Sequence, residues 1–170
     1  MKTFSEYDNA AADHHTKSNI RTVPVMSWDF HHEFVAELRA LKTDALRLQQ
    51  ISEAFNWDHQ WDFTKKLQQQ TILVTDAKLL IVFASENMTL MNGYKESEVL
   101  GKTPKIFQGK DTDRSLSKSI RKAVGNRKAF EATLLNYKKN GTTYHCHVKG
   151  FPVFDKTGNL CHFIAFETAA

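Results

Sequence analysis

Histidine and cysteine side chains lie close together in the last third of the sequence, in a pattern that could bind a metal ion. His145 and His147 flank Cys146, and His162 follows in the next predicted strand. Because side chains alternate between the two faces of a strand, His145 and His147 share a face and Cys146 lies on the other. Three imidazoles can bind Zn²⁺, and His162 could come alongside. Since no fixed carboxylate or thiolate shares that face, the pattern favours polar strand residues over a metal site.

Candidate nucleophiles are present without the groups that would activate them. Ser115, Ser117 and Ser119 have no obvious base partner, and no pair of carboxylates has catalytic spacing. Cys146 and Cys161 are the only cysteines, which is typical of a reducing compartment and excludes a disulfide framework. We expect two buried thiols rather than a disulfide. The sequence therefore predicts no catalytic residue and no enzyme.

The formal net charge of +4 is distributed unevenly. Residues 1–70 hold 8 Lys and Arg against 10 Asp and Glu, whereas residues 71–170 hold 15 against 9. The cations of the second part are dispersed among acidic residues, which favours a solvated surface over nucleic-acid binding. No apolar stretch is long enough to cross a membrane, and the N-terminus has no apolar run. We expect a soluble, cytoplasmic protein.

The elements that must position any site begin with a helical region. Residues 1–26 are polar, with little periodicity, as in a flexible arm. A helix is predicted to begin after Ser27 or Asp29, both good N-caps, and to end near Phe55. Its apolar residues recur at intervals of four and three, as at an a/d seam: Phe34, Leu38, Leu41, Ala45 and Leu48. Two heptads fit a dimer helix and an amphipathic helix folded onto its own domain equally well.

A second short helix is predicted after a break at Asn56. Trp57 and Trp61 would share one face of it at i, i+4. Two tryptophans this close are typical of an anchor in a packed interface, against the body of the domain or a second subunit. Residues 27–70 are thus predicted to be a helical extension. Its cap or dimer contacts are expected at Phe34, Leu38, Leu41, Leu48, Trp57 and Trp61.

From Thr71 the periodicity becomes that of strands. Two short apolar runs at residues 72–76 and 79–83 flank a turn, as in a hairpin. Helical segments are expected at 86–91, 95–99 and about 112–124, the last stopped by Gly125 and Asn126. Three further strands are expected at 128–137, 142–154 and 159–168, joined by turns at 139–141 and 155–158.

The run Gly-Lys-Thr-Pro-Lys-Ile-Phe-Gln-Gly at 101–109 resembles a loop of the light-oxygen-voltage (LOV) branch of the PAS superfamily. Asn92-Gly93-Tyr94 before it and Asn-Tyr-Lys-Lys-Asn-Gly at 136–141 extend the resemblance, which covers about Ile72 to Thr168. It implies an α+β fold in residues 71–170, a five-stranded antiparallel sheet with helices on one face. The family loop is G-R-N-C-R-F-L-Q-G, and its cysteine bonds reversibly to a flavin carbon in blue light. Pro104 takes that position and has no nucleophile.

The same resemblance implies a ligand pocket in which four residues suit a flavin. Gln108 and Asn136 keep residue types that line the family's flavin pocket, and Asn136 would hydrogen-bond the ring edge. Lys105 replaces one phosphate-binding arginine, and Arg121 keeps the other. These four residues favour retention of a flavin-like pocket.

Four other pocket positions depart from the family. Thr103 replaces an asparagine, Pro104 the reactive cysteine, Cys146 a ring-binding asparagine, and Glu167 the glutamine that relays the light signal. A thiol is too weak a donor to replace an amide, and an ionised Glu167 can only accept hydrogen bonds. Each unmatched group costs roughly 1 to 3 kcal/mol. We therefore expect no cofactor, with FMN or FAD as the alternative.

These features predict a sensory or protein-interaction module without cysteine-adduct photochemistry. Its signal would pass to a partner protein or through rearrangement of a homodimer, and a small molecule could occupy the pocket. Two alternatives stay open, a flavin-binding redox or light sensor without the cysteine, and a purely structural dimerisation module. Haem is excluded because residues 86–130 contain no histidine to serve as an axial ligand.

Overall fold

The computed structural model describes residues 26–170, so the predicted arm at 1–26 lies almost wholly outside the described residues. The chain divides into two compact units at Glu37 and Leu38, and the second unit, Leu38–Ala170, carries the sheet. The sequence placed the domain boundary near residue 70. The second unit begins earlier because the last part of the long helix and the segment after it pack into the sheet's core.

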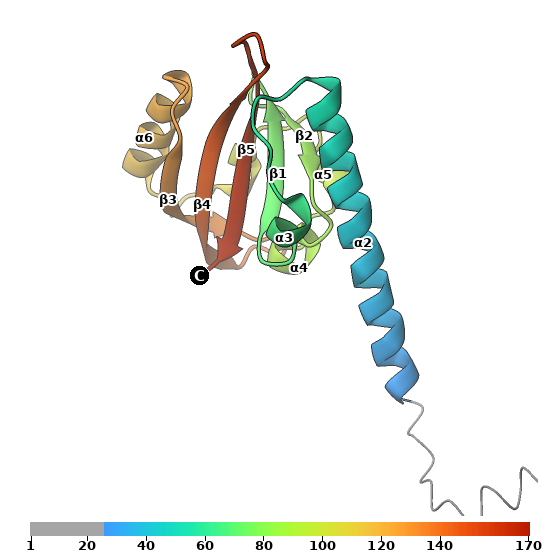
Figure 1. Ribbon diagram of the computed structural model, residues 1–170. Helices are drawn as coiled ribbons and strands as arrows, with labels where there is room; N and C mark the ends of the chain where they lie inside the picture. The colour runs from blue at the N-terminus through green and yellow to red at the C-terminus, as the bar shows by residue number, and fades with distance from the viewer. Residues whose placement is uncertain (1–25) are drawn as a thin grey trace, which may run out of the picture. The chain divides into compact units, whose positions relative to one another are not determined.

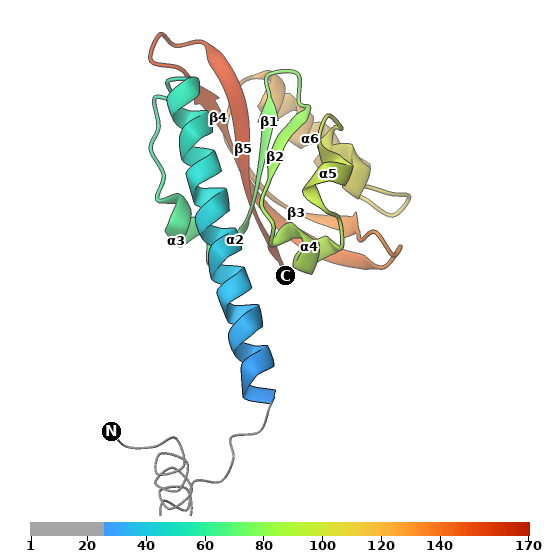
Figure 2. The ribbon, with the colours of Figure 1, turned by 90° about the vertical axis from the view of Figure 1, so that its right-hand side faces the viewer.

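The elements follow the predicted order (Figures 1 and 2). The helical segments are α2 (Met26–Ala54), α3 (Phe63–Leu67), α4 (Met88–Asn92), α5 (Glu96–Val99), the 3₁₀ turn η1 (Pro104–Phe107) and α6 (Arg114–Gly125). The strands are β1 (Thr71–Asp76), β2 (Ile81–Ala84), β3 (Phe130–Tyr137), β4 (Thr143–Phe154) and β5 (Leu160–Ala169). Among the described residues, no helix combines the length and apolar character needed to span a bilayer.

The five strands form one antiparallel sheet in the order β2-β1-β5-β4-β3, which confirms the predicted fold. β5 lies between β1 and β4 (Figure 1), and its Ala165 pairs with Leu73 of β1 and Gly150 of β4. The continuous apolar run at 72–74 is buried on both sides, as expected of a strand covered on both faces. In β4, buried positions instead alternate with more exposed ones over most of its length.

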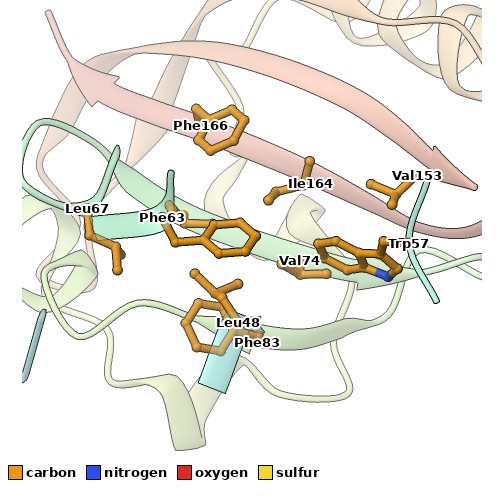
Figure 3. Packing of buried hydrophobic residues seen from close by; sticks show 10 residues of the cluster. Leu48, Trp57, Phe63, Leu67, Val74, Phe83, Val153, Ile164 and Phe166 are labelled. Carbon is orange, nitrogen blue, oxygen red and sulfur yellow. The ribbon is translucent and has the colours of Figure 1, made fainter. Parts of the chain in front are cut away.

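One face of the sheet is covered by the segment that precedes it. Leu48 of α2 is fully buried and packs with Trp57 and Phe63 against Ile164 and Val74 of the strands (Figure 3). Burying side chains of this size contributes roughly 1.5 to 3 kcal/mol each. The other face carries α4, α5, η1 and α6 over two further apolar clusters, so the sheet is covered on both faces.

The prediction that Trp57 and Trp61 share a helical face is wrong. Asn56 adopts a left-handed conformation with φ of 48°, and residues 57–62 are not helical. Trp57 forms an isolated bridge with Asp155 in the β4–β5 turn. The indole N–H of Trp57 donates to Nδ1 of buried His162 at 3.1 Å. The two indole rings still meet edge to face at 5.9 Å. The i, i+4 spacing of the two tryptophans did not produce a helix here, because the backbone of Trp57 pairs with a distant turn.

Polar contacts fix the second half of α2 to the unit. Arg47 makes two hydrogen bonds of 2.9 Å with the carboxylate of Glu96 in α5, and its guanidinium lies 4.9 Å from the Phe83 ring. Asp44 accepts from the backbone N–H of Glu86 at 2.7 Å. Burial of its carboxyl raises the pKa of Asp44, although that hydrogen bond and Arg47 act in the opposite direction.

The predicted contact residues of the extension divide into two groups. Leu48 and Trp57 are buried in the core, and Leu41 and Trp61 pack against it, so these four cap the sheet of their own chain. Phe34 and Leu38 are 58% and 47% exposed. A dimer contact therefore has only these two of the six residues available.

Candidate ligand-binding site

A cavity of about 610 Å³ lies between the sheet, η1 and α6. Its volume falls within the range of roughly 300 to 1,000 Å³ that is typical of small-molecule sites. Residues of β1, β3, β4 and β5 form one wall, and η1 and α6 form the other. The cavity therefore depends on four of the five strands and is not confined to one loop.

Seven of the eight predicted ligand residues line this cavity. They are Thr103, Pro104, Lys105, Gln108, Arg121, Asn136 and Glu167. Cys146 does not line it, because its thiol is fully buried among apolar residues beside Glu167. It cannot replace a ring-binding amide by direct contact.

The loop before α6 is held by its own 3₁₀ turn and by a hydrogen bond to the sheet. Thr103 is extended, as a residue before proline prefers, and Pro104 opens the 3₁₀ turn, where its missing N–H costs nothing. Buried Thr112 accepts a hydrogen bond from Gly109 and donates one to the carbonyl of Leu135 on β3. These contacts tie the loop to the sheet and keep Pro104 on the cavity wall.

Three buried polar side chains line the cavity with few partners. Within the described residues, Thr75 Oγ1 and Asn136 Oδ1 have no hydrogen-bond partner, although both residues are only 5% exposed. Glu167 is 7% exposed, and its carboxylate oxygen receives only the thiol of Cys146 at 3.7 Å. Unpaired buried polar atoms are costly, so this region suits a ligand that supplies hydrogen bonds.

Burial sets the protonation of Glu167 and its neighbours. Desolvation raises the pKa of Glu167 to about 7, and the thiol of Cys146 offsets only part of that effect. Burial also raises the pKa of the Cys146 thiol, and the nearby carboxylate adds to the rise. The thiol therefore stays protonated, and Glu167 is largely neutral below pH 7.

Five exposed cations line the cavity: Lys78, Lys105, Arg114, Lys118 and Arg121. None forms an ion pair within the described part of the chain, and Glu167 is the sole carboxylate among the lining residues. Removing these six side chains from the totals of 23 Lys and Arg and 19 Asp and Glu leaves 18 of each. The formal net charge of the protein is therefore concentrated around the cavity, where it favours an anionic ligand.

The sequence predicted only part of this cationic set. The cations of α6 were treated differently in the sequence analysis: Arg121 was expected to bind a phosphate, and Arg114 and Lys118 were not assigned to the site. All three line the cavity because spacings of four and three place them on one face of α6, whose N-terminus is capped by Asp113. The spacing of these three cations on one face of α6 was the sequence signal that could have identified them.

Other lining residues were not singled out from the sequence. Thr75 and Phe163 come from the central strands, and Phe130 and Val148 from β3 and β4. Strand alternation predicts which of them share a face, but the sequence does not show which stretch of that face a helix leaves uncovered.

His145, His147 and His162 do not come together in the sheet. His162 pairs with Val153 of β4, whereas His147 pairs with Thr168, so the expectation that His162 comes alongside is wrong. Among the described residues, no group of three or more His, Cys, Asp or Glu is placed to hold a metal ion. His147 instead contacts Glu131 at 2.9 Å. Cys161 is partly exposed rather than buried, and both cysteines are free.

Several curated proteins are similar to somewhat more than half of this chain. Phototropin-2 of Oryza sativa subsp. japonica is 36% identical over 102 residues, which is 58% of this chain and 11% of that protein. Protein TWIN LOV 1 of Arabidopsis thaliana is 38% identical over 88 residues, 51% of this chain and 22% of that protein. The chain thus spans less than a quarter of the length of each of these relatives.

Solved structures and a family model agree with the fold. The dark structure of the blue-light photoreceptor Aureochrome1 LOV has a TM-score of 0.60 and 30% identity, covering 66% of this chain and 86% of that one. A light-oxygen-voltage domain studied with a flavin analogue has a TM-score of 0.60 and 29% identity, covering 65% and 85%. The PAS domain model matches residues 69–168, more than half of the chain. The chain therefore belongs to the PAS domain family.

Proposed function

We propose that this PAS domain, related to blue-light sensors, binds a flavin mononucleotide and senses light or redox state without forming a bond to cysteine. The cavity carries this proposal. Within the part of the chain that the structure describes, it combines buried polar atoms that lack a partner with a surrounding set of cations that form no ion pair. These features favour the flavin-binding alternative over an empty pocket and over a purely structural module.

The residues of the cavity fit the parts of a flavin nucleotide. Asn136, Gln108 and Thr75 offer hydrogen-bonding groups to a planar ring whose edge carries donors and acceptors. Lys105 and Arg121 are available to hold a phosphate, which a guanidinium binds through two parallel hydrogen bonds. A bound flavin supplies blue absorption and the capacity to accept electrons.

The positions of the cysteines support the absence of bond formation to a thiol. Neither of the two cysteines lines the cavity, and both fall within the described residues. Cys146 lies behind Glu167 with a raised thiol pKa, so it supplies no thiolate nucleophile. Pro104 occupies the wall at the position where the resemblance expects the reactive residue.

Binding of FMN and of riboflavin, measured by flavin fluorescence, tests the phosphate contact. We expect FMN to bind at least about tenfold more tightly, because riboflavin lacks the phosphate. Arg121→Gln should reduce this preference about three- to tenfold, since an exposed charged contact contributes modestly. Lys122→Gln is the matched control, because Lys122 is the next cation of α6 and does not line the cavity. Failure of both flavins to bind would overturn the proposed function.

Illumination of the FMN-loaded protein tests the absence of thiol chemistry. We expect no loss of blue absorption that recovers in the dark with the kinetics of a broken carbon–sulfur bond. Pro104→Cys places a thiol on the cavity wall and should introduce such a reversible loss. A reversible loss in the unaltered protein that disappears in Cys146→Ser would contradict the proposal.

A further inference from the structure

Glu167 lies on the cavity wall with almost no partner of its own. It is on β5, opposite Thr71 of β1 and Val148 of β4, and it is 7% exposed. Its one hydrogen bond comes from the Cys146 thiol, a weak donor, at 3.7 Å. A buried carboxylate normally requires strong donors or a cation, and neither is present here.

The groups around Glu167 offer no compensating charge. From β4, the titratable neighbours are Cys146 and Tyr144, and burial raises the pKa of both, so both are neutral. From β1, the paired residue Thr71 carries no charge, and neither do Thr75 and Asn136, which line the same cavity. The five cations lining the cavity are exposed, and none is recorded within ion-pair distance of Glu167 in the described residues.

We propose that Glu167 binds the ligand as a neutral carboxylic acid that donates a hydrogen bond to a ligand acceptor, so that ligand binding takes up a proton. This inference rests on the proposed flavin site. It identifies hydrogen-bond acceptors of the flavin as the groups that Glu167 recognises. The oxidised flavin ring presents carbonyl oxygens and unprotonated ring nitrogens, which accept hydrogen bonds. An ionised carboxylate would meet these acceptors with another acceptor, whereas the acid form matches them.

Proton linkage gives the size of the effect. A ligand that binds only the protonated form loses affinity above the pKa of the free site and keeps it below. With burial raising that pKa to about 7, the dissociation constant rises about tenfold between pH 6 and pH 8. At pH 8 about 0.9 proton is taken up for each ligand bound.

The test compares FMN affinity in the full chain and in Glu167→Gln at pH 6, 7 and 8. Glutamine keeps the shape and a donor but does not titrate. Titration of the FMN phosphate and of distant side chains affects both proteins and cancels in the ratio of their dissociation constants. We expect that ratio, unaltered protein over variant, to rise about tenfold from pH 6 to pH 8.

Calorimetry in two buffers of different ionisation enthalpy provides a second measurement, on the unaltered protein alone. Uptake near one proton per FMN at pH 8 supports the proposal, even if the variant folds poorly. A ratio that stays constant with pH, or binding without proton uptake, overturns it while leaving the flavin site intact. No FMN binding at any pH would instead reject the flavin site itself.

Discussion

Gly150 shows how a single backbone position shapes the cavity. The ring of Phe130 lies where a side chain at residue 150 would be, and both residues line the cavity. Gly150→Ala must displace that ring, and overpacking of this kind costs roughly 1 to 3 kcal/mol. We expect FMN affinity to fall about tenfold, measured by fluorescence titration. Gly125→Ala is the control, because Gly125 lies in α6 with open space around it, and the change should leave binding unaffected.

The buried carboxyl of Glu167 also affects the stability of the ligand-free protein. Its pKa rises from an ordinary 4.5 to about 7 on folding, so the folded state holds the proton more tightly than the unfolded state. The contribution to stability is complete below pH 4.5 and is lost as the pH rises to about 7, an upper limit of about 3 kcal/mol.

Urea unfolding of the unaltered protein and of Glu167→Gln from pH 4.5 to 7.5 measures this loss. We expect the variant to gain about 1 to 3 kcal/mol relative to the unaltered protein over that range, because glutamine does not ionise. Parallel profiles for the two proteins would show that the carboxyl is solvated in the folded state.

At the residue scale, the family motifs of the sequence named residues that the fold gathers around one cavity. Seven of the eight predicted ligand residues line the cavity, and Glu167 is among them. Cys146 does not line the cavity. Strand alternation predicts the face on which a residue lies but not how far along the strand it lies from the cavity. Arg114 and Lys118 were missed because the direction in which an amphipathic helix turns its charges depends on packing.

At the scale of elements, the link between Trp57 and His162 joins the segment before the sheet to β5. The indole donates to Nδ1, so that nitrogen must be unprotonated, and burial lowers the pKa of His162 while Asp76 opposes the change. The folded state therefore binds this proton less readily than the unfolded state. Stability from this group is present above pH 6.5 and is lost as the pH falls below that value.

Substitution of His162 by asparagine tests this link. An asparagine oxygen can accept from the indole but does not titrate, so His162→Asn should lose less stability than the unaltered protein between pH 6.5 and 5. Trp57→Phe removes the donor and leaves a buried acceptor, at a cost of roughly 1 to 3 kcal/mol at pH 7.5. Equal acid sensitivity in the unaltered protein and His162→Asn would show that His162 protonates freely in the folded state.

Element boundaries followed from the sequence more closely than the path between elements did. The strands and α6 begin and end within a few residues of their predicted positions, because alternation and the stop at Gly125 are local signals. The path from Asn56 to Asp62 was not predictable in this way. It is set by pairing with Asp155, about a hundred residues away, which no local pattern encodes.

At the scale of the whole molecule, the apolar residues of α2 that remain exposed predict self-association. Phe34 and Leu38 lie four residues apart on the helix, and their exposed fractions are 58% and 47%. We expect a dimer at micromolar concentration in sedimentation, and Leu38→Glu should dissociate it by placing a charge in the contact. Leu90→Glu, at an 81% exposed leucine of α4, is the control. An unaltered protein that sediments as a monomer would refute the prediction.

The central position of β5 has a consequence for folding kinetics. Val153 and His162 close a loop of nine residues between β4 and β5, whereas Leu73 and Ala165 join β1 to β5 across 92. Loop closure costs about 2 kcal/mol for the first and about 4 for the second, so we expect the β3–β4–β5 and β1–β2 parts to form before they join. The cavity needs both, and FMN should therefore slow unfolding in stopped-flow experiments while leaving the refolding rate unchanged.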